Sequence, residues 1–271
     1  MTLTQAPTID LSAPVNLRDL GGTPVADGVI ATGFALRSDD LATITEDAAD
    51  ALVTEGLRSV IDLRSRDEVF ITGRGPLLDR VVNYHHVPLM ATIGSATTPH
   101  RDVAAVAAAA PLRTMNDMPS MHDLYVSRFE TAPGALVSAL AIMAHSPGAT
   151  AFHCAAGKDR TGVLAAALLL ALGADDETII ADYRATYPNL EAIMTRTGSY
   201  MHHVMALAGF DLQAYQNSTD DPDERLAKDQ ASMADTLATL RARYGDPLTP
   251  LYEAGLSTAL IDALRERAVI A

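Results

Sequence analysis

The decapeptide HCAAGKDRTG at 153–162 constrains the fold of this 271-residue chain more than any other segment. It follows the short apolar stretch GATAF and precedes the apolar run VLAAALLLAL. The first stretch predicts a buried strand, and the longer run predicts a buried helix that begins near Thr161. In a strand–loop–helix of this kind, the loop N–H groups and the positive end of the helix dipole converge. The segment therefore predicts a binding site for a small anion.

Strand and helix patterns alternate through the first two-thirds of the chain. Strands are predicted at 58–63 and 81–89, and a hairpin or a pair of short strands at 28–38. Helices are predicted at 45–56, 120–130 and 134–144. This alternation predicts an α/β fold with a central, partly parallel sheet flanked by helices.

The last third of the chain has helical patterns almost throughout. They cover 175–187, 191–209, 223–245 and 257–270, and the acidic segment at 217–223 interrupts them. We expect a single domain over 1–271, in which residues 190–245 form a helical, lid-like insertion.

The net charge of −14 argues against nucleic acid as a partner and against stable association with an anionic membrane. The N-terminus has no basic region followed by an apolar stretch, and the run at 163–172 is too short to span a bilayer. We expect a cytoplasmic protein, or one that is secreted without a cleavable signal peptide.

Cys154 is the only cysteine, which excludes an internal disulfide and a multi-cysteine metal site. The histidine pairs 85–86 and 202–203 have no carboxylate at a metal-ligand spacing, and adjacent side chains on a strand point to opposite faces. The sequence therefore predicts neither a metal site nor an organic cofactor.

Cys154 lies at the start of the predicted anion site, where positive potential stabilises a thiolate. The planar guanidinium of Arg160 can hold two phosphate oxygens, and Lys158 adds charge at the rim. The backbone N–H groups that complete the predicted phosphate site belong to Ala155, Ala156, Gly157 and Lys158. This pattern predicts attack of sulfur on phosphorus, a cysteinyl-phosphate intermediate and its hydrolysis by water.

Two flanking residues have supporting roles in this interpretation. Thr161 is placed to donate its hydroxyl to the sulfur as it leaves, and His153 to orient the loop through backbone bonds. By itself, a lone Cys154 is more typical of a small buried apolar residue. The joint spacing of cysteine, glycine, arginine and threonine favours the chemical role.

The decapeptide resembles the C-x5-R signature loop of the cysteine-dependent protein tyrosine phosphatase superfamily, and its Lys-Asp-Arg-Thr form resembles the bacterial, mycobacterial-type branch. The segments NLRDLGG, ALRSDDL and VIDLRSRDEV, beginning at 16, 35 and 60, are similar to N-terminal blocks of that family. The resemblance implies a phosphatase of broad specificity for phosphotyrosine, phosphoserine, phosphothreonine and phosphoinositides. Because the chain is acidic, we favour soluble phosphopeptides or small phosphoesters over lipids.

The family's general acid, an aspartate after a strand that ends in proline, is missing here. Pro88 lies in HHVPLMATIGS, which contains no carboxylate. Candidate substitutes are Asp117, Asp123 and Asp159. We favour Asp159 because it is next to Arg160 in the loop. The alternative is that Asp159 is a structural carboxylate paired with Lys158 or with a loop amide.

Other functions and roles stay open at this point. A loop without a competent acid would bind phosphorylated ligands without turning them over. A rhodanese-type sulfurtransferase also has a cysteine in an anion-binding loop, although the five-residue spacing to Arg160 disfavours it. Residues with both a structural and a functional interpretation are Arg18, Asp19, Arg64, Tyr200, Met201 and Met205.

Overall fold

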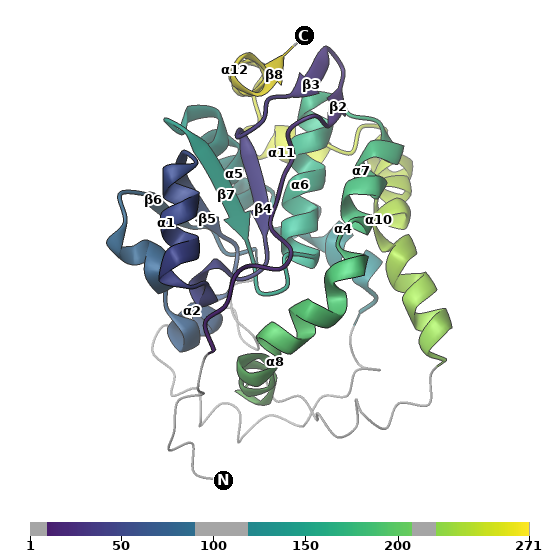
Figure 1. Ribbon diagram of the computed structural model, residues 1–271. Coiled ribbons are helices and arrows are strands. Elements are labelled where there is room, and N and C mark those ends of the chain that lie inside the picture. Colours follow the sequence, from purple (N-terminus) through teal and green to yellow (C-terminus); the bar gives the residue numbers. More distant parts are fainter. Residues whose placement is uncertain (1–9, 90–118, 208–220, 271) are drawn as a thin grey trace.

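A five-stranded sheet forms the centre of the computed structural model, which describes residues 10–89, 119–207 and 221–270 (Figure 1). Its strand order is β1-β4-β7-β5-β6. These strands are β1 (Arg18–Asp19), β4 (Ala35–Ser38), β7 (Ala149–His153), β5 (Leu57–Asp62) and β6 (Asn83–His86). The last four run parallel, and β1 is antiparallel to β4. The predicted α/β fold with a partly parallel sheet is confirmed.

Helices cover both faces of this sheet and enclose two apolar cores. The larger core contains side chains of α4 (Met121–Thr131), α5 (Pro133–His145), α6 (Asp159–Leu172), α7 (Asp176–Arg184), α10 (Pro222–Tyr244) and α12 (Thr258–Ala268). The smaller core contains side chains of α1 (Glu46–Thr54) and of the 3-10 turns η1 (Leu41–Thr43) and η2 (Gly75–Asp79). Strand alternation divides β7 between them, since Phe152 faces the larger core and Ala151 the smaller.

The predicted strand–loop–helix occupies the middle of the molecule. All five residues of β7 are buried, and the strand lies between its parallel neighbours β4 and β5. Cys154 therefore follows at the carboxyl edge of the sheet, where open α/β sheets form their binding sites. Helix α6 begins at Asp159, two residues before the predicted start, because Lys158 is the N-cap and its carbonyl accepts from Gly162 N at 2.7 Å.

Several predicted boundaries need correction. Strands β3 (Gly28–Ile30) and β4 are two short strands as one alternative had it, but they belong to different sheets and form no hairpin. β3 pairs with β2 (Pro24–Val25) and with β8 (Val269–Ile270). The last predicted helix thus ends at Ala268, where the chain becomes extended to pair with β3.

The predicted helix 175–187 also ends early, at Arg184. A 3-10 turn, η4 (Tyr187–Asn189), contains Pro188 and leads into α8 (Leu190–Leu207). Two short helices escaped the sequence patterns: α2 (Arg66–Thr72) and α11 (Thr249–Glu253). Within the described ranges, no helix is long and apolar enough to cross a membrane.

The segment expected to form a lid contains α8 and α10. Met233, Leu237 and Leu240 of α10 are buried in the larger core, and α10 packs on α4 and α7. This part of the segment is an integral layer of the fold. Residues 208–220 lie outside the described ranges, and the single-domain organisation and the lid-like role of 190–245 stay predictions.

Candidate active site

The side chain of Cys154 is buried at the carboxyl end of β7, where it meets one hydroxyl group. Thr161 Oγ1, on the first turn of α6, donates a hydrogen bond to Cys154 Sγ at 3.2 Å. The thiol therefore does not lie in a purely hydrocarbon environment. A hydroxyl donor to sulfur stabilises a thiolate, and this is the contact expected for Thr161 from the sequence.

The loop after Cys154 turns its carbonyl oxygens outward, toward the sheet side. Ala155 O accepts from Asp40 N at 3.0 Å, and Gly157 O accepts from Arg37 Nη2 at 2.8 Å. Ala156 O and Gly157 O also accept from Asn16 Nδ2, each at 3.2 Å. Within the described part of the chain, none of the N–H groups of residues 155–158 donates to a protein group. This backbone arrangement is suited to an anion.

Gly157 is required by both backbone conformation and space. Its φ is +67°, a conformation that L side chains rarely adopt, and an added Cβ would lie 2.5 Å from Ser38 O. Helix α6 then begins without a side-chain N-cap. Its N-terminal dipole therefore adds to the positive potential of the loop.

A buried polar layer beneath the loop holds Asn16 and Arg37 in place. The guanidinium of Arg37, which has no solvent exposure, pairs with Asp182 of α7. Arg18 also bonds to Asp182, at 3.2 Å, and donates to Asn16 Oδ1 at 2.7 Å. Arg18 thus supports the loop through Asn16. Asp19 instead fixes a turn, because its carboxylate accepts from Gly21 N and Gly33 N.

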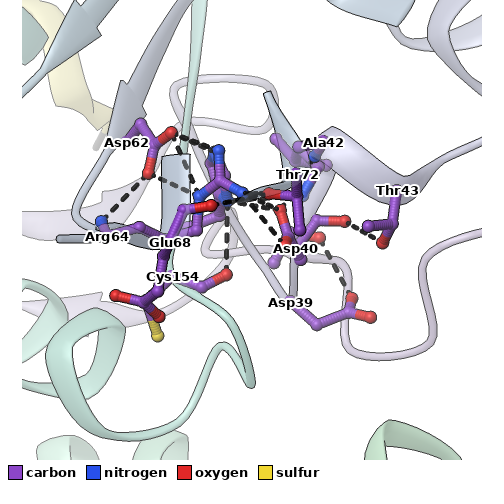
Figure 2. A network of polar contacts seen from close by, with 12 residues as sticks. Asp39, Asp40, Ala42, Thr43, Asp62, Arg64, Glu68, Thr72 and Cys154 are labelled. Carbon is purple, nitrogen blue, oxygen red and sulfur yellow. Dashed lines mark hydrogen bonds and ion pairs between the residues drawn. The ribbon is translucent and has the colours of Figure 1, made fainter. Parts of the chain in front are cut away.

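His153 lies in a second buried network, with its ring nitrogens 3.7 Å from Asp40 and 3.8 Å from Asp62. Figure 2 shows Arg64 at the centre of this network, bonded to Asp62 and Asp40. The guanidinium of Arg64 contacts Asp62 at 2.6 Å and Asp40 at 3.1 Å. These buried ion pairs match the structural interpretation of Arg64 and not the functional one. Leu41 N donates to His153 Nδ1 at 3.3 Å. Burial lowers the pKa of His153, which matches this acceptor role of its neutral ring. The role of His153 in orienting the loop stays a prediction.

Glu68 of α2 holds the guanidinium of Arg160 in a two-bond pair, with N–O distances of 2.5 and 2.8 Å. Glu68 is itself fixed by a capping box, since its carboxylate accepts from Ser65 N and Ser65 Oγ accepts from Glu68 N. Burial would raise the pKa of Glu68, but Arg160 and Ser65 lower it to about 2. Glu68 is therefore ionised at neutral pH.

Arg160 is also electrostatically linked to the sulfur. Burial would lower its pKa, but interactions with Glu68 and with Cys154 raise the pKa above its ordinary value. Cysteine, arginine and the N-terminus of α6 thus lie close together, and their joint role as one anion site stays a prediction. The structure shows in addition that a buried carboxylate directs the arginine.

Lys158 and Asp159 face the opposite side of the loop, toward the C-terminal helices. Lys158 Nζ lies 2.7 Å from Asp229 Oδ1 of α10 and 3.3 Å from Asp159 Oδ1. Tyr125 of α4 donates its hydroxyl to the same Asp159 oxygen. Lys158 therefore directs its ammonium at two carboxylates, and Asp159 makes the pair with Lys158 that was the alternative to an acid role.

The other candidate acids are not brought to the loop in the described structure. Asp123 is 60% exposed at the start of α4, where Ser120 Oγ donates to it at 2.7 Å. Asp117 lies outside the described residues. Asp159 consequently remains the candidate that the described structure places beside the loop.

Comparison with known proteins identifies the family of this chain. The sequence profile of the tyrosine phosphatase family matches residues 9–270. The chain belongs to that family. Triple specificity protein phosphatase PtpB of Mycobacterium tuberculosis is 28% identical over 281 residues, covering 94% of this chain and 97% of that protein. A tyrosine-protein phosphatase of Nostoc commune is 30% identical over 158 residues, covering 58% and 49% of the two chains.

Sequence interpretation missed several residues around this phosphatase loop: Asn16, Arg37, Glu68, Tyr125 and Asp229. Only Glu68 had a readable local signal, the Ser-x-x-Glu capping box at 65–68. The other four act at sequence separations that local patterns do not report. Tyr200 proved to be a buried residue of α8 that donates to Asp40 at 2.9 Å. Met201 is half-buried, and the side chain of Met205 is not among those that the structure describes.

A shallow cleft of about 350 Å³ lies away from this loop. Its lining includes Ser59 and Asn83, near the amino ends of β5 and β6, and His145 and Pro147, near the end of α5. The phosphatase loop is at the carboxyl edge of the sheet, so the cleft is separate from the candidate active site. Among the described residues, no group of three or more histidine, cysteine or acidic side chains is arranged to hold a metal ion.

Proposed function

We propose that this phosphatase hydrolyses phosphomonoesters through a cysteinyl-phosphate intermediate. Cys154 Sγ attacks phosphorus as the ester oxygen leaves, and water then displaces the sulfur and releases inorganic phosphate. The loop N–H groups and the Arg160 guanidinium hold the phosphoryl oxygens in both steps. The Thr161 hydroxyl stabilises the thiolate when it leaves.

One observation carries the proposal: Thr161 donates a 3.2 Å hydrogen bond to the sulfur, in a loop whose carbonyl oxygens are hydrogen-bonded to Asn16 and Arg37. A buried structural cysteine needs neither feature. With Arg160 held by Glu68, the arrangement supplies nucleophile, phosphate clamp and stabilised leaving sulfur without a cofactor.

We propose Asp159 as the group that protonates the leaving oxygen. Its side chain is 39% exposed, and it lies between Lys158 and Arg160. Burial would raise the pKa of Asp159, but Lys158, Tyr125 and Arg160 lower it overall. In the free enzyme Asp159 therefore holds its proton only at acidic pH. A bound phosphate dianion raises the pKa of a neighbouring carboxyl, which opposes this effect.

The decisive experiment compares wild type with Cys154→Ser on p-nitrophenyl phosphate, whose leaving group needs little protonation. Wild type should release phosphate and form a phosphocysteine that acid quenching and mass spectrometry detect at residue 154. The serine variant should lose at least a thousandfold in kcat, because its hydroxyl is not ionised. An active serine variant, or phosphate on another residue, would contradict the mechanism.

The lowered pKa of Asp159 favours a second candidate, a protein that binds phosphorylated ligands with negligible turnover. In that case wild type would bind phosphate in calorimetry but leave p-nitrophenyl phosphate intact.

We propose phosphorylated peptides and small phosphoesters as the substrates, with phosphotyrosine first and phosphoserine, phosphothreonine and phosphoinositides also accepted. The charge of −14 disfavours adhesion to an anionic bilayer. A panel of phosphopeptides and soluble phosphoinositides, assayed with wild type and Cys154→Ser, tests this ranking. Preference for lipid vesicles over soluble headgroups would contradict it.

A further inference from the structure

Two carboxylates from distant parts of the chain share the ammonium of Lys158. Asp159 belongs to the first turn of α6, and Asp229 lies on α10, which packs against α4 and α7. The Nζ–Oδ1 distances are 3.3 and 2.7 Å. The Lys158 side chain is only 10% exposed, which strengthens its interaction with both partners.

Three tyrosines complete a closed network of contacts around Lys158. Tyr125 donates to Asp159 and lies 2.9 Å from Tyr183 through their hydroxyls. Tyr187 donates to Asp229 Oδ2 at 3.0 Å. The rings of Tyr183 and Tyr187 are edge-to-face, with centroids 5.8 Å apart, and each lies less than 6 Å from the ammonium. Lys158 is thus enclosed by phenol rings and by two acids.

We propose that Asp229 is a positioning residue for catalysis, which acts through Lys158 to set the charge and direction of Asp159. The inference rests on the proposed function. It adds a residue of α10 to the groups that control catalysis, although the sequence of the loop gives no sign that this helix is involved. Asp229 touches no reacting atom in this scheme. It fixes the cation that in turn controls the acid.

The direction of the effect follows from charge. Asp159 is faced by two cations, Lys158 and Arg160, and by the phenols of Tyr125 and Tyr183. Asp229 and Tyr187 face Lys158 instead, so they act on Asp159 through that ammonium. Asp229 competes for the ammonium that stabilises the Asp159 carboxylate, so it keeps Asp159 easier to protonate. Without Asp229, the whole field of Lys158 acts on Asp159 and lowers the Asp159 pKa further.

Neutralising Asp229 should therefore move the basic limb of the kcat/KM profile toward acidic pH. Asp229→Asn should shift it by about half a pH unit on phenyl phosphate, whose leaving oxygen needs a proton. Lys158→Met keeps the apolar stem against the tyrosines and should shift the limb in the opposite direction. In the Lys158→Met background, Asp229→Asn should move the limb by less than half as much, because the connecting cation is gone.

Asp235→Asn is the matched control, since Asp235 is exposed on the same helix and carries the same charge. It should leave the limb unmoved, and Asp229→Glu should restore most of the wild-type profile. Should Asp229→Asn fold poorly, Lys158→Met still tests the proposal through its shift of the limb toward alkaline pH. Tyr187→Phe removes the donor that neutralises part of the Asp229 charge, so it should give a smaller shift in the same direction as Lys158→Met. The second ionisation of the substrate is common to all variants and cancels.

A contact that only docks α10 predicts a different result. Asp229→Asn would then lower the melting temperature and reduce activity equally at every pH, with the limb unmoved, and this outcome overturns the inference. An equal shift in Asp235→Asn overturns it as well. The proposed function fails separately: it fails if Cys154-dependent hydrolysis of p-nitrophenyl phosphate is absent in wild type.

Discussion

The two sides of the phosphatase loop are held by different kinds of contact. On the sheet side, Asn16, Arg37 and Asp40 bond to the loop backbone, and all three are fully or almost fully buried. On the helix side, Asp159 and Asp229 bond to a loop side chain and are 39% and 23% exposed. The groups on the sheet side contact carbonyl oxygens of the loop, whereas those on the helix side contact the charged side chain of Lys158.

This difference separates two tasks. Bonds to the backbone from buried groups fix where the loop N–H groups point, and a change there deforms the phosphate site. Bonds from the partly exposed carboxylates alter protonation at a smaller cost in folding free energy, because solvent screens those carboxylates. We therefore expect variants on the sheet side to lose structure and activity together, and variants on the helix side to change the pH dependence of activity.

Among the variants that compare the two sides, the largest effect is expected for Gly157→Ala, on the sheet side. The methyl group meets the Ser38 carbonyl at 2.5 Å in a backbone conformation with φ of +67°. Relief requires the loop to move, so kcat/KM should fall more than a hundredfold and the free energy of unfolding by about 1–3 kcal/mol. Hydrolysis of p-nitrophenyl phosphate and urea unfolding measure the two.

The matched control is Gly198→Ala in α8, where an added Cβ has no neighbour within 4 Å. It should keep wild-type activity and gain up to about 1 kcal/mol in stability, as expected for alanine in a helix. If Gly157→Ala behaved like this control, the sheet side would not be the rigid part of the loop.

Glu68→Gln should have the next largest effect. Glutamine preserves the side-chain length and can still accept from Ser65 N, but it removes the charge that holds Arg160. A freely rotating guanidinium misplaces the phosphate clamp, so kcat/KM should fall by about thirtyfold to a hundredfold. Glu55→Gln, an exposed charge change at the end of α1, should leave activity unchanged.

The same variant tests stability against pH. The folded-state pKa of Glu68 is about 2, below its ordinary value of 4.5, so this carboxylate stabilises the fold fully above pH 4.5. That stabilisation, on the order of 3 kcal/mol, is lost as pH falls from 4.5 through 2. Between these values, unfolding free energy should therefore fall less steeply in Glu68→Gln than in wild type. If the unfolding free energies of the two proteins fell in parallel with pH, Arg160 would be held mainly by a group other than Glu68.

The contrast between the two sides also explains how much the sequence could predict. The decapeptide and the apolar stretches on either side of it predicted the strand, the loop and the helix, because apolar patterning and glycine act locally. The contact between Cys154 and Thr161, seven positions apart, was expected from the same segment. These predictions concern groups that lie on one continuous segment.

The partners of the loop are remote in sequence, which is why most of them were missed. Asn16 reaches the Gly157 carbonyl across 141 positions and Asp229 reaches Lys158 across 71. A single sequence contains no record of which strands become neighbours in a sheet. The short strand β8 was missed for the same reason, because only pairing with β3 makes Val269 and Ile270 extended.

The smallest of these effects is expected for Asp159→Asn, on the helix side. Because Lys158, Tyr125 and Arg160 lower the pKa of Asp159, only a fraction of it is protonated near neutral pH. Loss of the acid should therefore slow phenyl phosphate hydrolysis by only about tenfold, below the usual range for a general acid, and leave p-nitrophenyl phosphate hydrolysis nearly unchanged. The slowing should grow as pH falls, since wild type then gains protonated Asp159. Urea unfolding should show little change, because the carboxylate is 39% exposed and screened. Equal slowing of both esters, together with a large loss of stability, would make Asp159 a structural residue and would remove the distinction between the two sides of the loop.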